Sequence, residues 1–83
     1  MPGVTLDRVR TIVATLFNVP LMDVLPESTP ESIAGWDSMG HLSLILQLEE
    51  EFGIRLLPEQ AEAMTSVAAV AAEVDVSAAT RAR

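Results

Sequence analysis

Three residues near the middle of the chain could take part in chemistry: the carboxylate of Asp37, the hydroxyl of Ser38 and the imidazole of His41. Such a set would suit a hydrolase, in which a base activates a serine and an acid orients the base. Ser38 and His41 are three positions apart, which puts them on one face of a helix. A hydrolase also needs an acid on the far imidazole nitrogen, an oxyanion hole and a substrate cleft, and neighbours on one helix supply none of these. The sequence therefore favours a protein that is not an enzyme.

A second use of Ser38 follows from its place at the start of a predicted helix. Serine at such a position is commonly an N-cap, which bonds the free amides of the first turn. The same amides and the positive end of the helix dipole also favour an anion. A phosphate esterified to the hydroxyl would be stabilised there by about 0.3–1 kcal/mol. Position alone leaves both interpretations open.

The hydrophobic spacing predicts an all-α fold that begins with a helix over residues 5–17. A 3, 3, 1, 3 spacing places its apolar residues on one face: Leu6, Val9, Ile12, Val13 and Leu16. Thr5 is the expected N-cap, and Pro20 follows the end of the helix. Residues 18–37 then form a long loop rich in proline and serine, which scattered apolar residues such as Trp36 are expected to pin over the core.

The best-defined helix runs from Asp37 or Ser38, either of which is a suitable N-cap, to Phe52. Gly53 stands where a left-handed C-cap residue is expected. The inward residues of this helix are predicted to include Leu42, Ile45 and Leu48.

Two further helices complete the predicted four-helix bundle. A short third helix begins at Pro58, and Thr65 or Ser66 caps a fourth. The inward face of the fourth helix is expected to carry Val67, Val70, Ala71 and Val74. Residues 77–83 show no periodicity and are expected to fray.

Length and composition restrict the function further. The 83 residues indicate one domain, 1–83, with an ordered core over about residues 4–76. An apolar share of 49% excludes a disordered chain, and the absence of cysteine excludes disulfides, thiol catalysis and cysteine-ligated metals. Neither a signal peptide nor an apolar run of about 20 residues is visible, so a cytoplasmic monomer without membrane insertion is expected.

The acidic charge of the chain is concentrated in its middle. Residues 1–22 have a net charge of +1, and residues 63–83 have none. Residues 23–62 hold nine acidic residues and only Arg55 as a base, a net charge of −8. Nucleic acid is not an expected partner of such a chain, because phosphate binding needs clustered basic residues. The acidic region is either a solvated face or a surface for basic protein partners.

Several motifs in this order resemble the acyl carrier protein family. Asp37-Ser38-Met39 corresponds to the family's Asp-Ser-Leu motif at the start of helix two, and Leu48-Glu49-Glu50-Glu51-Phe52 to the run that ends this helix. The likeness covers nearly the whole chain, up to Thr65-Ser66-Val67 at the last helix. It implies a discrete acyl or peptidyl carrier. A phosphopantetheinyl transferase would attach 4′-phosphopantetheine from coenzyme A to Ser38, and the thiol of this arm would hold the cargo as a thioester.

The resemblance also implies roles for the residues around Ser38. Asp37, Met39 and His41 would lie beside the arm. The partners would be the transferase, an acyl- or aminoacyl-loading enzyme and downstream synthases. The residues expected to meet them are Met39, Leu42, Leu46, Glu49, Glu50 and Glu51.

Two features bear on the choice of partner and cargo. Gly40 and Ser43 stand where carriers of fatty-acid synthesis often have acids, and the motif around them looks closer to stand-alone carriers of specialised pathways. The fourth helix supplies mainly valines and alanines, which would leave a shallow interface that could part for a short acyl chain. A polar or very short cargo would instead stay in solvent.

Some residues keep a second interpretation. His41 is expected to be a solvent-exposed helix residue, with contact to the phosphate as the alternative. Trp36 is expected to anchor the loop rather than touch the arm. Met39 and Leu42 either pack inward or form an apolar patch for partners. The rival function is a small acidic helical interaction module without a prosthetic group, and a mass gain on Ser38 would distinguish the two.

Overall fold

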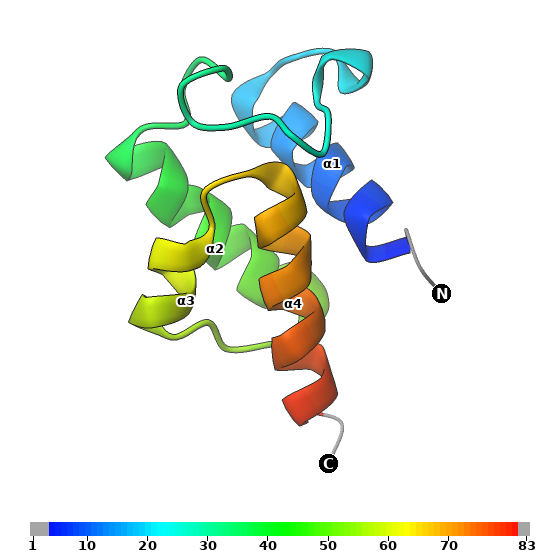
Figure 1. Cartoon of the computed structure of the whole chain (residues 1–83), viewed down its shortest axis with the longest axis vertical. Coiled ribbons are helices and arrows are strands. Elements are labelled where there is room, and N and C mark those ends of the chain that lie inside the picture. The colour runs from blue at the N-terminus through cyan, green and yellow to red at the C-terminus, as the bar shows by residue number, and fades with distance from the viewer. Residues whose placement is uncertain (1–3, 82–83) are drawn as a thin grey trace.

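The computed structural model describes residues 4–81. Its elements follow in the order α1 (Val4–Phe17), the 3₁₀ helix η1 (Leu21–Asp23), α2 (Ser38–Phe52), α3 (Pro58–Ala63) and α4 (Val67–Arg81). No strand occurs among these described residues. The predicted all-α fold, with its long first loop and short third helix, is confirmed (Figure 1).

The long loop lies across one end of the bundle and is tied to α4 (Figure 1). The first amides of α4 donate to loop carbonyls, from Val67 to Ser28 O over 2.9 Å and from Ala68 to Pro26 O over 2.8 Å. At its other side the loop is held by Arg10 of α1, whose Nε donates to Val24 O over 2.6 Å. The loop is therefore fixed at both sides, which gives the start of α2 a defined position.

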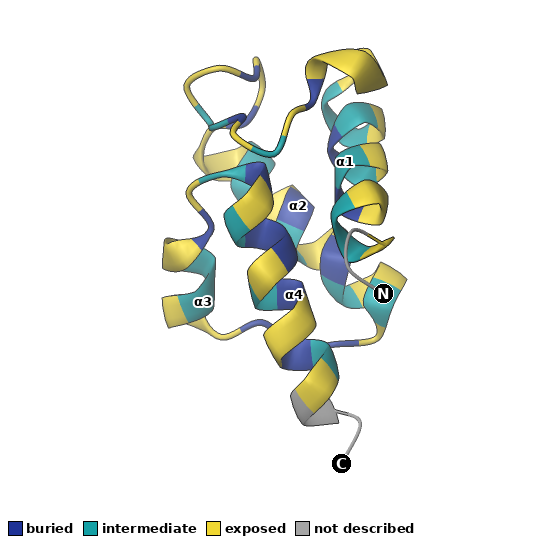
Figure 2. Cartoon of the chain, turned by 45° about the vertical axis from the view of Figure 1, so that its right-hand side comes forward, coloured by how far each residue is buried: buried dark blue, intermediate teal, exposed yellow. Residues whose placement is uncertain are grey.

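The core lies where α1, α2 and α4 face one another (Figure 2). The fully buried side chains from these helices are Val9, Val13, Leu44, Leu48, Val67, Val70 and Val74. The loop adds Val24, Ile33 and Trp36, all buried, so the predicted pinning of the loop by scattered apolar residues is confirmed.

The buried face of α2 differs from the predicted one. Leu44 and Leu48 are buried, Ile45 is half-buried, and the Leu42 side chain is 53% exposed. A row at four-residue spacing thus faces the core, and the row that includes Leu42 and Leu46 faces solvent. The prediction that Leu42 packs inward is wrong, and the alternative of an exposed apolar patch holds.

The helix caps follow the sequence in most places. Gly53 has φ 64 and ends α2 in the left-handed conformation, as predicted. Asn18, with φ 56, follows α1 in the same region. Of the two cap candidates for α4, Ser66 has this role, because its Oγ accepts a hydrogen bond from the Ala69 amide over 3.1 Å.

Thr5 is not the N-cap of α1. The helix already includes Val4, and residues 1–3 lie outside the described part of the chain. The Thr5 hydroxyl instead donates to Asp75 Oδ1 of α4 over 2.6 Å. The contact joins residues 70 positions apart, which a local sequence pattern does not reveal.

Residues 77–81, which the sequence predicts to fray, are helical in the structure. Helix α4 continues to Arg81, and residues 82–83 lie outside the description. Ser77 is buried and accepts a hydrogen bond at Oγ from Gln60 Nε2 over 2.9 Å, and Ala78 packs against the core. This last turn has no clear apolar periodicity, but it includes alanines, and alanine has the highest helix propensity of all residues. Within residues 4–81, no helix has both the length and the apolar character needed to cross a membrane.

Gly40 allows α2 to approach the preceding loop very closely. A Cβ built at Gly40 would overlap the carbonyl oxygen of Gly35 and lie 2.8 Å from Phe17 Cε1. Gly35 itself has φ +91, a conformation that favours glycine. The first turn of α2 therefore sits directly on the loop backbone and on the end of α1.

Gly40→Ala should lower the free energy of unfolding by about 1–3 kcal/mol, because the added methyl group overpacks this contact. Helix propensity alone predicts the opposite, a gain of about 1 kcal/mol. Urea unfolding of Gly40→Ala and of the control Ser43→Ala, an exposed position on the same helix, measures the difference. A Gly40→Ala variant at least as stable as the control would contradict the close contact.

Candidate functional site

Asp37, not Ser38, caps α2. Asp37 has an extended backbone, and its Oδ1 accepts a hydrogen bond from the Gly40 amide over 2.9 Å. Ser38 is the first helical residue and is exposed, and among the described residues no group bonds its hydroxyl. The interpretation of Ser38 as only a helix cap is therefore excluded. Its hydroxyl is available for reaction.

The first amides of α2 surround this hydroxyl with a positive field. Within the described part of the chain the backbone N–H groups of Ser38 and Met39 have no hydrogen-bond partner, whereas the His41 amide donates to Asp37 O over 2.7 Å. Free amides and the helix dipole together stabilise an anion at such a place. A phosphate bound to Ser38 would meet these groups without competing with Asp37 for the Gly40 amide.

An open depression of about 690 Å³ lies beside Ser38. We call it the Ser38 depression. It is bounded by the start of α2, by the long loop at Glu31, and by Ala61, Met64 and Thr65 where α3 leads into α4. Trp36 and His41 line it as well. A flexible arm on Ser38 would have room here, so the surroundings fit a long substituent.

His41 is not the solvent-exposed helix residue that the sequence predicts. Its ring is half-buried and bridges two elements: Trp36 Nε1 donates to His41 Nδ1 over 2.9 Å, and His41 Nε2 lies 2.9 Å from Ala61 O. Both hydrogen bonds form together when the proton is on Nε2, so that Nε2 donates and Nδ1 accepts. The sequence does not predict this contact of Ala61, because its carbonyl is 20 positions from His41 in the chain.

Trp36 anchors the loop, as predicted. Its side chain is only 3% exposed, stacks on the Phe17 ring and lies edge to edge with the His41 ring, to which it donates the hydrogen bond described above. The centroid of the Trp36 ring system lies 6.1 Å from that of Phe17 and 6.2 Å from that of His41, with interplanar angles of 20° and 16°. Sequence reasoning missed the role of Phe17, the last residue of α1, which packs against the core and also stacks on Trp36 of the site.

One face of α2 presents apolar side chains to solvent next to Ser38. Met39 is 75% exposed, Leu42 53% and Leu46 58%. Their spacing continues to Glu50, which is exposed and has no hydrogen bond or ion pair within the described residues. These four residues, here called the exposed stripe, form a surface that begins beside Ser38.

The three consecutive glutamates, all expected to bind partners, differ in their surroundings. Glu49 is half-buried and accepts a hydrogen bond at Oε2 from the Leu56 amide over 2.9 Å. Glu51 lies 3.7 Å from the Arg8 guanidinium of α1. The helix dipole disfavours a carboxylate at the C-terminal end of α2, and the hydrogen bond from Leu56 compensates Glu49 for this cost. Of the three glutamates, only Glu50 has no such contact within the described residues and is free for a partner.

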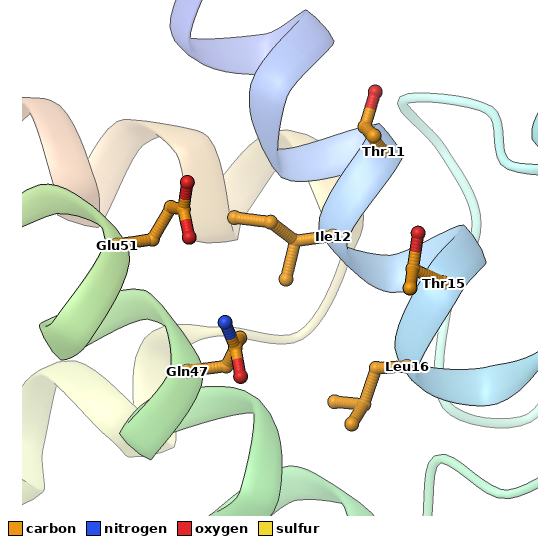
Figure 3. A pocket seen from close by; sticks show the side chains of 6 residues that line it. All are labelled: Thr11, Ile12, Thr15, Leu16, Gln47 and Glu51. Carbon is orange, nitrogen blue, oxygen red and sulfur yellow. The ribbon is translucent and has the colours of Figure 1, made fainter.

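A second hollow lies apart from Ser38. It has a volume of about 450 Å³ and opens between α1 and α2, with Ile12 and Leu16 on one side and Gln47 and Glu51 on the other (Figure 3). None of its lining residues belongs to the Ser38 depression. This hollow is therefore not part of the candidate site.

Comparisons with known proteins agree on one family. Residues 7–74 match the family described as "Phosphopantetheine attachment site". A curated acyl carrier protein from Thermosynechococcus vestitus is 37% identical over 62 residues, which cover 75% of this chain and 76% of that protein. The solution structure of holo acyl carrier protein from Geobacter metallireducens has a TM-score of 0.84 and 28% identity, and covers 99% of this chain and 92% of that one.

The cap geometry makes different predictions for two neighbouring residues. Asp37→Ala should lower the free energy of unfolding by about 1 kcal/mol, because the Gly40 amide loses its partner. Ser38→Ala should change it by less than about 0.5 kcal/mol, since the hydroxyl bonds nothing. Urea unfolding measures both, with Asp37→Asn as a control that retains a capping side chain. Equal losses in Asp37→Ala and Ser38→Ala would show that the hydroxyl does cap the helix.

Proposed function

The chain belongs to the acyl carrier protein family, whose defining feature is a phosphopantetheine attachment site, and we propose that Ser38 is the residue to which the arm is attached. A protein of this family is a carrier and not an enzyme, and 4′-phosphopantetheine is its prosthetic group. When bound, this group supplies a thiol that holds the cargo as a thioester. The rival interpretation, an interaction module without a prosthetic group, is not retained, because family membership rests on the attachment site.

The free hydroxyl of Ser38 is the observation that carries the assignment. Asp37 caps the helix in its place, so that forming a phosphodiester at Ser38 Oγ breaks no hydrogen bond of the described structure. The unpartnered amides of Ser38 and Met39 would then face the negative charge of the phosphate. Trp36 and His41 hold this turn of helix in place from the side of the core.

The composition suits the handling of a thioester. The chain has no cysteine, so the thiol comes with the prosthetic group. It also has no lysine, so no side-chain amine is present to which a bound acyl group could be transferred. Cargo on the arm is thereby kept for the partner enzymes with which a carrier works.

We propose that the exposed stripe of Met39, Leu42, Leu46 and Glu50 is the surface where these enzymes dock. It starts beside Ser38, and its mixture of exposed apolar side chains and one free carboxylate suits a partner with an apolar patch and a basic rim. The partners we expect are a phosphopantetheinyl transferase, an acyl- or aminoacyl-loading enzyme and a downstream synthase. We also expect a cytoplasmic location, since coenzyme A donates the arm.

Ser38→Ala should take up no arm. The measurement is the intact mass after incubation with coenzyme A and a transferase of broad specificity. The unmodified chain should gain the mass of one phosphopantetheine group, and the control Ser43→Ala, which removes another exposed hydroxyl of α2, should gain the same. A mass gain that persists in Ser38→Ala would refute the assignment.

Glu50→Lys should slow association with the transferase and weaken its dependence on salt, because it reverses the one free charge of the exposed stripe. The melting temperature should change little, since Glu50 has no bond to lose. Stopped-flow binding at several ionic strengths measures the rates. Glu27→Lys, an exposed loop position, makes the same change in net charge. Equal slowing in both variants would show that net charge, not docking on the stripe, is responsible.

A further inference from the structure

Helix α3 is held by one polar side chain on each of its two sides. Toward α4, Gln60 Nε2 donates to Glu73 Oε1 over 3.1 Å and to Ser77 Oγ over 2.9 Å. Toward α2, the contact is the 2.9 Å hydrogen bond between His41 Nε2 and Ala61 O. Among the described residues, this is the only side-chain hydrogen bond that joins α2 to α3. Any opening between these two helices near Ser38 must break it.

His41 cannot turn away easily, because its ring is also fixed on the side of the loop. Trp36 Nε1 donates to His41 Nδ1 over 2.9 Å, and the two rings are nearly coplanar, with an interplanar angle of 16°. Trp36 in turn stacks on Phe17 at the end of α1. Moving His41 would therefore break the hydrogen bond from Trp36 as well as the bond to Ala61.

This bridge lies at the boundary where the Ser38 depression meets the core. Trp36 and Met64 line the depression and are themselves buried core residues, whereas the core residues Leu44 and Leu48 do not line it. Leu44, Leu48, Val67 and Val70 have no exposed surface. An acyl chain could reach them only by displacing packed side chains, which protein interiors resist.

We propose that the Trp36–His41–Ala61 bridge is a closed gate between the Ser38 depression and the core, so that the cargo stays outside the bundle and belongs to the short or polar acyl groups. A long apolar chain held outside would remain in water, which the hydrophobic effect disfavours in proportion to its area. A short acyl or an aminoacyl group has little apolar area to hide. The inference rests on the proposed attachment at Ser38 and adds to it the class of cargo.

The test uses the whole chain carrying the arm alone, an acetyl cargo or an octanoyl cargo, each confirmed by intact mass. Amide chemical shifts of Leu44, Leu48, Val67 and Val70 report on the core, and the Trp36 indole N–H reports on the depression. In the unmodified chain neither cargo should move the four core amides. In His41→Ala the octanoyl cargo should move them and the acetyl cargo should not.

Two variants separate the gate from general loosening. His41→Gln keeps a donor for Ala61 O and should retain the closed behaviour. Glu62→Gln changes another residue of the same depression, without a part in the bridge, and should also behave like the unmodified chain.

Each outcome bears on one proposal. Octanoyl-dependent shifts of the core amides in the unmodified chain would overturn the gate, and this measurement needs no variant to fold. Core amides that stay unmoved in a folded His41→Ala would also overturn it, because another element would then exclude the cargo. A missing mass gain on the unmodified chain would contradict attachment at Ser38 itself, which the mass spectrum shows before any chemical shift is compared.

Discussion

The contacts of Trp36, which stacks on Phe17 and donates a hydrogen bond to His41, determine the geometry of the site. They bring together the end of α1, the long loop and the first turn of α2. An aromatic pair such as Trp36 and Phe17 contributes about 0.5–1.5 kcal/mol beyond the burial of its area. Ser38 lies between Trp36 and His41 in the sequence, and both of these side chains are held toward the core. The serine is thereby turned to solvent on a helix start that is itself fixed.

Charged side chains divide between two tasks in the acidic part of the chain. Glu49 bonds the backbone after α2 and Glu51 pairs with Arg8, so both contribute to the fold. Arg8 also lies 4.2 Å above the ring of Phe52, which places the cation where the aromatic quadrupole attracts it. Glu50 stands between two acids with structural contacts, and it is the one of the three that has no hydrogen bond or ion pair within the described residues. A run of identical residues thus need not be a single functional surface.

Features that depend on neighbouring residues could be predicted from the sequence, and those that depend on distant contacts could not. The caps at Asp37, Gly53 and Ser66 follow from local backbone chemistry, as do the positions of the four helices. The hydrogen bond between His41 and Ala61 depends on tertiary packing, and no local sequence pattern predicts it. The sequence predicts the wrong inward face for α2 because the helix carries apolar residues on several of its sides. These residues are Leu42, Leu44, Ile45, Leu46 and Leu48. Such a run fits several faces, and only the packing partners choose among them.

Trp36 has a further consequence for how the protein can be observed. It is the only tryptophan of a chain without tyrosine, so the intrinsic fluorescence excited at the red edge of absorption comes from one indole. That indole is buried, hydrogen-bonded to His41 and two residues from Ser38. Emission colour and intensity respond to the polarity and hydrogen bonding around an indole. The chain therefore contains an optical reporter two residues from the proposed attachment site, and loading or docking there can be followed in real time without a dye.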